Sequence, residues 1–135
     1  PAVFFKGNRD IALTDAISKG SLKHRWINEN PFKSLFWAVQ GIAAELTTGA
    51  LLLGKIKDSG ENISMLVVNN NATFTKKATG RITFTCTEGQ KVDAAIKKAI
   101  ETNEGQTLWM QSRGMNADGV EVSVFNFEWT IKRKT

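Results

Sequence analysis

The 135-residue chain contains one cysteine and one histidine, and this scarcity excludes several kinds of site. A disulfide framework and a cysteine-based metal site both need more than one thiol, so Cys86 alone supports neither. His24 alone likewise excludes a zinc site built from several histidines. The sequence therefore predicts no metal centre. On its strand, Cys86 is expected to pack as an inert thiol rather than act as a nucleophile, and His24 to be structural rather than catalytic.

The sequence also lacks a signal-peptide pattern, a domain linker, an internal repeat and a second long apolar run. Hydrophobic residues at 41% and charged residues at 23% are ordinary for a globular chain. We therefore expect one cytoplasmic domain over residues 1–135, in which residues 1–10 are the remnant of an N-terminal element. The net charge of +5 suits a phosphorylated cofactor, a nucleic acid or an anionic membrane, and also an ordinary solvated basic surface.

One long apolar stretch organises the rest of the chain. It runs from Ser34 to Gly54 and contains a single charged residue, Glu45. Apolar residues recur within it at steps of three and four, which predicts a helix, and its other face is hardly more polar. The sequence therefore predicts a central helix that is covered on most sides.

Glu45 is a functional-site candidate because a carboxylate in such a helix loses hydration. Three alternatives stay open. The side chain could reach solvent through a narrow polar stripe of Gln40, Thr47 and Thr48, or it could pair with a basic residue. The stretch is also about the ~20 residues that a bilayer requires, although its polar residues and three glycines disfavour a membrane span.

The residues before the helix carry a start signal. Asn30 followed by Pro31 fits an N-cap and a first helical position. The helix start would leave backbone N–H groups around Phe32, Lys33 and Ser34 without intrahelical acceptors. These donors would form a site for a carbonyl oxygen or an anion.

The remaining patterns predict strands around this helix. A β-hairpin is expected over residues 11–27, with its turn at Ser18–Gly20. Residues 90–103 have one apolar and one charged face, which predicts a surface helix. The last strand changes phase at Val124–Phe125, as at a β-bulge. Alternating residues predict strands after the central helix over 63–68 and on through 72–75, then over 82–87, 108–113 and 120–131.

The order of elements, the Asn30–Pro31 opening with Glu45 fifteen residues on, and the later segment ATFTKKATGRITFTC resemble the hotdog-fold acyl-CoA thioesterases. The resemblance covers about residues 11–132, and within that superfamily it points to the bacterial domain-of-unknown-function 4442 branch, which is related to the phenylacetic-acid-degradation thioesterases. It implies an α+β hotdog fold, in which a mostly antiparallel sheet wraps a long central helix. It also implies a homodimer or homotetramer with active sites at the subunit interface and no cofactor other than the CoA of the substrate.

The same resemblance implies roles for individual residues. Glu45 would be the general base or nucleophile on a thioester, Asn30 would position the water or the carboxylate, and Thr48 or Thr47 would hydrogen-bond the attacking water. Either threonine hydroxyl could instead be satisfied by its own helix backbone. The substrate would lie against residues at the helix start, together with Thr47: Lys33, Ser34, Phe36 and Trp37.

Two competing functions stay open at this point. Many relatives carry a glycine and a histidine pair where this chain has Lys33, Phe36 and Trp37, which favours a non-catalytic acyl or acyl-CoA binder as the alternative. Nucleic-acid binding is disfavoured, because the basic residues are scattered and no aromatic platform is interleaved with them.

Overall fold

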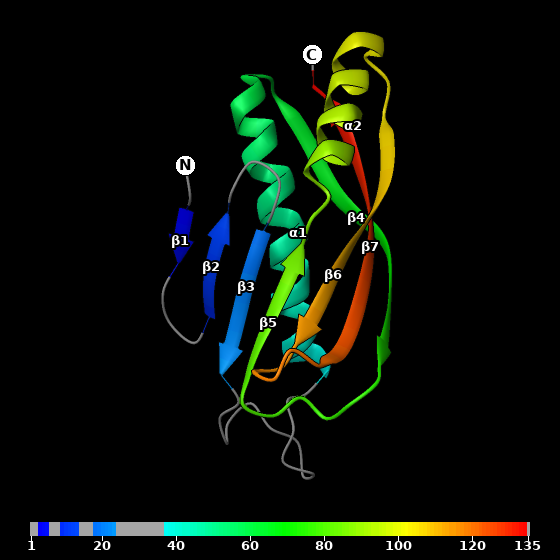
Figure 1. The fold of residues 1–135 in the computed structure, drawn as a ribbon. Helices are drawn as coiled ribbons and strands as arrows, with labels where there is room; N and C mark the ends of the chain where they lie inside the picture. The colour runs from blue at the N-terminus through cyan, green and yellow to red at the C-terminus, as the bar shows by residue number, and fades with distance from the viewer. Residues whose placement is uncertain (1–2, 6–8, 14–17, 24–36, 135) are drawn as a thin grey trace.

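A computed structural model of the chain describes residues 3–5, 9–13, 18–23 and 37–134. Within that part, one seven-stranded sheet in the order β1-β2-β3-β5-β6-β7-β4 curves around a long helix, and every strand pair is antiparallel (Figure 1). The helices are α1 (Trp37–Ser59) and α2 (Gly89–Thr102). The strands are β1 (Val3–Phe5), β2 (Arg9–Leu13), β3 (Ser18–Lys23), β4 (Ile63–Phe74), β5 (Arg81–Cys86), β6 (Gln106–Met115) and β7 (Glu121–Arg133).

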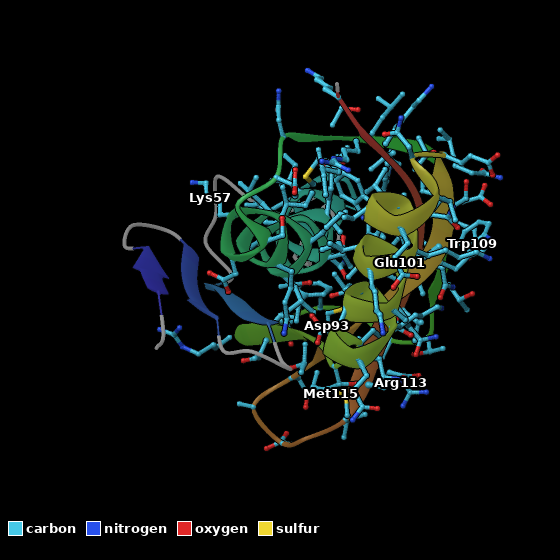
Figure 2. The ribbon with its side chains drawn as sticks, turned by 90° about the horizontal axis from the view of Figure 1, so that it is seen from above. Lys57, Asp93, Glu101, Trp109, Arg113 and Met115 are labelled. Atoms are coloured by element: carbon cyan, nitrogen blue, oxygen red, sulfur yellow. The ribbon has the colours of Figure 1, made fainter. Side chains whose placement is uncertain are left out.

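The predicted α+β class and the antiparallel sheet around a central helix are confirmed. Seen from above, α1 is viewed nearly end-on between the first strands and α2 (Figure 2). The surface helix expected over residues 90–103 is α2, which buries Val92, Ile96 and Ala99. Every strand expected after the central helix is present. The two stretches predicted over residues 63–75 form one strand, β4.

The N-terminal hairpin is present, but its turn is not where the sequence placed it. The two strands are β2 and β3, which are separated by residues 14–17. Ser18–Gly20, expected as the turn, belongs to β3 and pairs with Phe84–Cys86 of β5. Ser-Lys-Gly favours a turn locally, but pairing with a central strand overrides that preference. Val3–Phe5, which the sequence left unassigned, pairs with β2 as β1, and His24 lies outside the described residues.

The central helix is longer at its C-terminal end than the apolar pattern predicted. The apolar stretch ends at Gly54, whereas α1 continues to Ser59 and is followed by Gly60 at a φ of +72°. Ile56 in this last segment is buried. The Lys55 Nζ lies 3.2 Å from the Asp93 carboxylate of α2, so the extra turn joins the two helices.

The predicted bulge in the last strand exists, although its position differs by two residues. Ser123 pairs with Gly114 and Glu121 pairs with Met115, which leaves Val122 as the extra residue. Val122 and Ser123 are both buried, and burial then alternates from Phe125 to Ile131. The change of phase in the sequence therefore reflected a real irregularity of the ladder.

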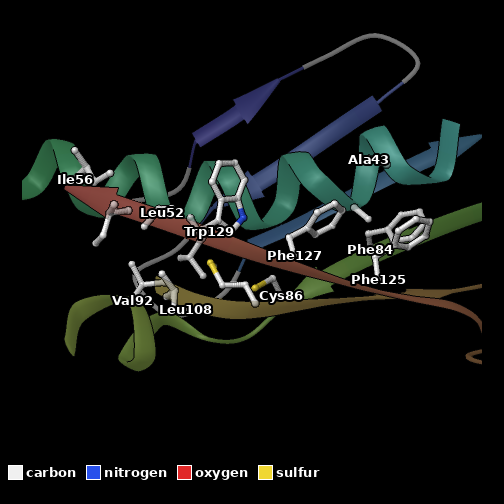
Figure 3. Close-up of a cluster of buried hydrophobic side chains, with 14 of the residues drawn as sticks. Ala43, Leu52, Ile56, Phe84, Cys86, Val92, Leu108, Phe125, Phe127 and Trp129 are labelled. Carbon is white, nitrogen blue, oxygen red and sulfur yellow. The ribbon is translucent and has the colours of Figure 1, made fainter. Parts of the chain in front are cut away.

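The core lies between the inner face of the sheet and the two helices (Figure 3). Two glycines of α1 allow the helix to approach aromatic rings of β7. A Cβ on Gly41 would lie 3.5 Å from the Phe125 ring, and one on Gly49 would lie 3.3 Å from the Trp129 ring. These contacts align α1 along β7, and they fix which side of the helix faces the sheet.

Candidate active site

The side of α1 that faces the sheet carries its polar residues. Gln40, Thr47 and Thr48 are all buried. The Ser123 hydroxyl donates to Gln40 Oε1 at 2.8 Å, and the Thr47 and Ser112 hydroxyls lie 2.7 Å apart. The polar stripe that was predicted as a path from Glu45 to solvent therefore points into the core. That path is wrong, although the Glu45 side chain does reach solvent.

Trp129 extends this polar seam between helix and sheet. Its indole Nε1 donates to Thr48 Oγ1 at 3.0 Å, and the Thr48 hydroxyl donates to the Glu45 carbonyl oxygen at 2.9 Å. A hydrogen bond contributes about 1 kcal/mol, whereas a buried polar group left unpaired costs about 1–3 kcal/mol. Since these groups can pair only in one alignment, the seam fixes the rotation of α1 on the sheet.

The opposite side of α1 is apolar and exposed in the single chain. Ile42 is 52% exposed and Leu53 is 44% exposed. We call this surface the outer face of α1. The expectation that the helix is covered on most sides is therefore wrong for one chain. Leu51, Leu52 and Ile56 of α1 are buried, so its apolar residues are divided between the core and the outer face.

Glu45 lies at the border of this outer face, on the helix row of Gly41 and Gly49, which approach the Phe125 and Trp129 rings of β7. Its side chain is exposed, with Ile42 about one turn before it and Leu53 about two turns after it. Among the described residues, no lysine or arginine forms an ion pair with Glu45, so the alternative of a basic partner finds no support there. The arrangement is a carboxylate that is free to act, beside an apolar surface suited to an acyl chain.

The structure does not bring the two predicted threonines to this carboxylate. Thr47 donates to the Ala44 carbonyl at 2.8 Å, and Thr48 donates to the carbonyl, not to the carboxylate, of Glu45. Both hydroxyls are thus satisfied by their own helix backbone, which was the structural alternative for them. Trp37, at the start of α1, is 69% exposed, but it lies about two and three turns before the buried Ala44 and Thr48 on their side of the helix. The other predicted site residues lie outside the described residues: Asn30, Lys33, Ser34 and Phe36.

Sequence reasoning missed the residues that hold Glu45's helix in place. Ser112 and Ser123 are small polar residues at positions of β6 and β7 that face the core, and Trp129 is the aromatic residue that bonds Thr48. Ser112 follows the buried Leu108 and Met110 in the alternation of β6. A serine at a core-facing position of the strand is the signal in the sequence that a polar partner lies opposite it on the helix.

Cys86 is buried at the end of β5, and desolvation raises the pKa of its thiol to about 11. The thiol is therefore neutral near pH 7, which argues against a nucleophilic role. No group of three or more metal-ligating side chains occurs in the part of the chain that the structure describes. None of its described helices combines the length and the hydropathy of a membrane span, which removes that alternative for α1.

Comparison with known proteins identifies the fold. The sequence matches no protein-family model and no curated protein. Among solved structures, a protein of unknown function from Pseudomonas aeruginosa, described as a probable thioesterase, superposes with a TM-score of 0.82 at 18% identity, over 93% of this chain and 83% of that chain. A protein of unknown function from Chlorobaculum tepidum gives 0.80 at 12% identity, over 94% and 83%.

A thioesterase from Haemophilus influenzae gives a TM-score of 0.68 at 15% identity, over 93% of this chain and 78% of that chain. Identities this low establish the fold and not the activity. The chain therefore has the hotdog fold that the sequence resemblance implied, with thioesterase-like proteins among its structural neighbours.

Proposed function

We propose that this hotdog-fold protein hydrolyses an acyl-CoA or a related thioester, with Glu45 as the general base or the nucleophile. The observation that supports the proposal most is the exposed Glu45 carboxylate beside the apolar outer face of α1. The thioesterase descriptions of two structural neighbours support it at the level of the fold. The narrower family branch and the cytoplasmic setting expected from the sequence remain part of this proposal.

In the general-base route, a water oxygen attacks the thioester carbonyl carbon while the Glu45 carboxylate accepts the proton of that water. The carbon–sulfur bond then breaks, and the products are a carboxylic acid and a free thiol, to which the proton passes. Negative charge develops on the carbonyl oxygen, and backbone N–H groups near Lys33 and Ser34 are the proposed donors to it. Asn30 is proposed to orient the water. Thr48 takes a positioning role, since it holds the backbone of Glu45.

Self-association completes the proposed site. Burying apolar surface stabilises by about 25 cal/mol per Å². Contact of the outer face of α1 with another subunit would therefore be favourable. We propose a homodimer or homotetramer in which this contact encloses Glu45 at the subunit interface. Excluding water there would strengthen the interaction of the carboxylate with the reacting groups.

The proposed substrate follows the chemistry of this surface. The acyl group would lie along the outer face of α1, beside Trp37 and Phe36, with Thr47 behind it in the core. Exposed lysines would meet the CoA phosphates, and the net charge of +5 favours such a ligand. The lysines available for this role are spread over the loop after β4 and the C-terminal segment: Lys76, Lys77, Lys132 and Lys134.

A non-catalytic acyl or acyl-CoA binder is the second candidate. The observation that favours it is the bulk of Trp37, which is exposed at the start of α1, about two turns before Glu45. A large indole there would narrow the approach of a thioester carbonyl to the carboxylate. The two candidates share a ligand, and they differ in whether Glu45 changes a rate.

The experiment is a thiol-release assay of the purified protein on acyl-CoAs from acetyl to palmitoyl and aromatic. Glu45→Ala is compared with Glu104→Ala, which removes an exposed carboxylate outside any helix or strand. The proposal predicts turnover of at least one substrate, a loss of at least ~100-fold in Glu45→Ala, and no change in Glu104→Ala.

Equal turnover in the wild type and Glu45→Ala would remove Glu45 from the chemistry. Absence of turnover on every substrate, together with acyl-CoA binding by calorimetry that survives in Glu45→Ala, would establish the binder instead. Circular dichroism of each variant confirms that a lost rate is not a lost fold.

A further inference from the structure

A chain of two hydrogen bonds runs from β7 to the backbone of Glu45. Trp129 Nε1 donates to Thr48 Oγ1 at 3.0 Å, and Thr48 Oγ1 donates to the Glu45 carbonyl oxygen at 2.9 Å. Trp129 and Thr48 are both buried, so water competes little for these groups. Hydrogen bonds in series polarise one another in such an environment, which strengthens each of them. The helical turn that carries Glu45 is therefore tied to a residue of the sheet.

A second chain of hydrogen bonds, one residue earlier in α1, has the same design. Thr47 Oγ1 donates to the Ala44 carbonyl oxygen at 2.8 Å, which uses the single proton of that hydroxyl. Ser112 Oγ of β6 lies 2.7 Å from Thr47 Oγ1 and is therefore the donor to it. Both chains join the sheet to a carbonyl group of α1. They differ in whether that carbonyl belongs to Glu45 or to Ala44.

The Trp129 ring also sets how closely the Glu45 turn approaches the sheet. A Cβ on Gly49 would lie 3.3 Å from the ring, so the helix backbone and the indole are nearly in contact. Gly49 is one turn after Glu45 on the same row of the helix. The indole extends from β7 toward α1 (Figure 3). One side chain thus holds this turn both by a hydrogen bond and by packing.

The strand next to Trp129 is irregular at the same level. Val67 of β4 pairs with Trp129. The next pair along the ladder joins Asn69 to Glu128, which leaves Val68 as an extra residue of β4. A β-bulge increases the local twist of a strand, re-aims nearby side chains and is frequent beside active sites. The bulge is an independent indication that the orientation of Trp129 matters.

Trp129 acts on Glu45 without touching the carboxylate. An indole has one N–H, and Thr48 accepts it, so no donor is left for the Glu45 carboxylate. Side chains of a helix are tilted toward its N-terminus, so Glu45 is directed toward the Gly41 turn and away from Gly49. Any effect of Trp129 on the reaction therefore passes through Thr48 and the helix backbone.

We propose that Trp129 is a positioning residue for Glu45 and acts through the Thr48 hydroxyl. The indole N–H holds the hydroxyl, and the hydroxyl holds the Glu45 carbonyl, so the carboxylate starts from a fixed point on the sheet. Such positioning matters for the rate, because a displacement of about 1 Å can cost about 100-fold. The inference rests on the proposed function, and it assigns a role to a residue on a different element.

The experiment measures steady-state thiol release by a set of variants on the best acyl-CoA of the panel. Trp129→Phe removes the N–H and keeps an aromatic ring, and Thr48→Val removes the hydroxyl at nearly constant size. Thr48→Ser restores the hydroxyl. Ser112→Ala is the matched control, because it breaks the chain that ends on Ala44 instead of Glu45.

We expect kcat to fall by at least ~10-fold in Trp129→Phe and in Thr48→Val, while KM changes little. The double variant should lose no more than either single variant, because both substitutions break the same chain. Thr48→Ser and Ser112→Ala should keep the wild-type kcat. Thermal unfolding shows whether each variant is folded at the assay temperature, and Thr48→Val carries the test if Trp129→Phe does not fold.

The outcomes separate this inference from the proposed function. An active wild type with an unchanged kcat in the folded Trp129→Phe variant would overturn the inference alone. An equal loss of kcat in Ser112→Ala would also overturn it, because general loosening of α1 would then explain the rate. Absence of turnover by the wild type on every substrate would overturn both.

Discussion

At the scale of single residues, the polar seam between α1 and the sheet decides which groups are available for chemistry. Thr47, Thr48 and Gln40 bond Ser112, Trp129 and Ser123, whereas the Glu45 side chain is exposed. The same burial that satisfies the hydroxyls also makes Cys86 a poor nucleophile. Glu45 is therefore the carboxylate that the apolar part of this helix offers for chemistry.

Burial of Cys86 has a measurable consequence for stability. Desolvation raises the pKa of the folded-state thiol from 9.0 to about 11, so the folded state binds the proton more tightly than the unfolded state. This contribution to stability is fully present below pH 9 and is lost as the pH rises toward 11. Between pH 8 and 10.5, urea unfolding should show the wild type losing about 2 kcal/mol more than Cys86→Ala. Equal losses of unfolding free energy in the wild type and Cys86→Ala would contradict this prediction. They would show that the thiol has the same pKa in the folded and unfolded states.

At the scale of elements, the fit of α1 against β7 depends on Gly41 and Gly49, which form a matched pair. Alanine is favoured over glycine inside a helix by about 1 kcal/mol. A Cβ at Gly41 meets Phe125 at 3.5 Å, an ordinary contact. A Cβ at Gly49 meets the Trp129 ring at 3.3 Å, and that ring is held by its hydrogen bond to Thr48.

We therefore predict that Gly41→Ala stabilises the protein by about 0.5–1 kcal/mol, whereas Gly49→Ala destabilises it by about 1 kcal/mol. Chemical unfolding monitored by tryptophan fluorescence gives both values. Equal stabilisation by the two substitutions would mean that the Trp129 ring moves freely, and that the seam does not fix the rotation of α1.

The elements themselves could be predicted from the sequence to different degrees. Alternation in Arg81–Cys86 and Gln106–Met115 identified strands, and the change of phase near Val124 revealed the bulge at Val122. The turn placed at Ser18–Gly20 was wrong, because pairing with β5 is a long-range effect that local composition does not encode. The start of the candidate site, at Asn30 and Lys33, lies outside the described residues.

The side of α1 that faces the sheet could not be predicted from the sequence either, for a related reason. Its apolar residues surround the helix almost completely, so the pattern shows no strongly preferred buried side. The side that faces the sheet is chosen by Ser112, Ser123 and Trp129, which lie 65, 83 and 81 residues from their partners in α1. Glu45 was identified as the candidate carboxylate, whereas its exposure follows only from these distant contacts.

At the scale of the whole molecule, the outer face of α1 is an exposed apolar surface in the described part of the chain, with Ile42 and Leu53 next to Glu45. A second copy covering this face would convert an exposed carboxylate into an enclosed one. The proposed activity and the proposed assembly are therefore linked through Glu45.

The most direct measurement of the central claim is the steady-state rate of thiol release by Glu45→Gln on the best substrate of the acyl-CoA panel. Glutamine keeps the size and polarity of the side chain and cannot accept the proton of water. If Glu45 acts as the base, kcat falls by at least ~100-fold while KM changes little, and Glu104→Gln retains the wild-type rate. A Glu45→Gln variant that turns over like the wild type would contradict the claim that this carboxylate performs the hydrolysis.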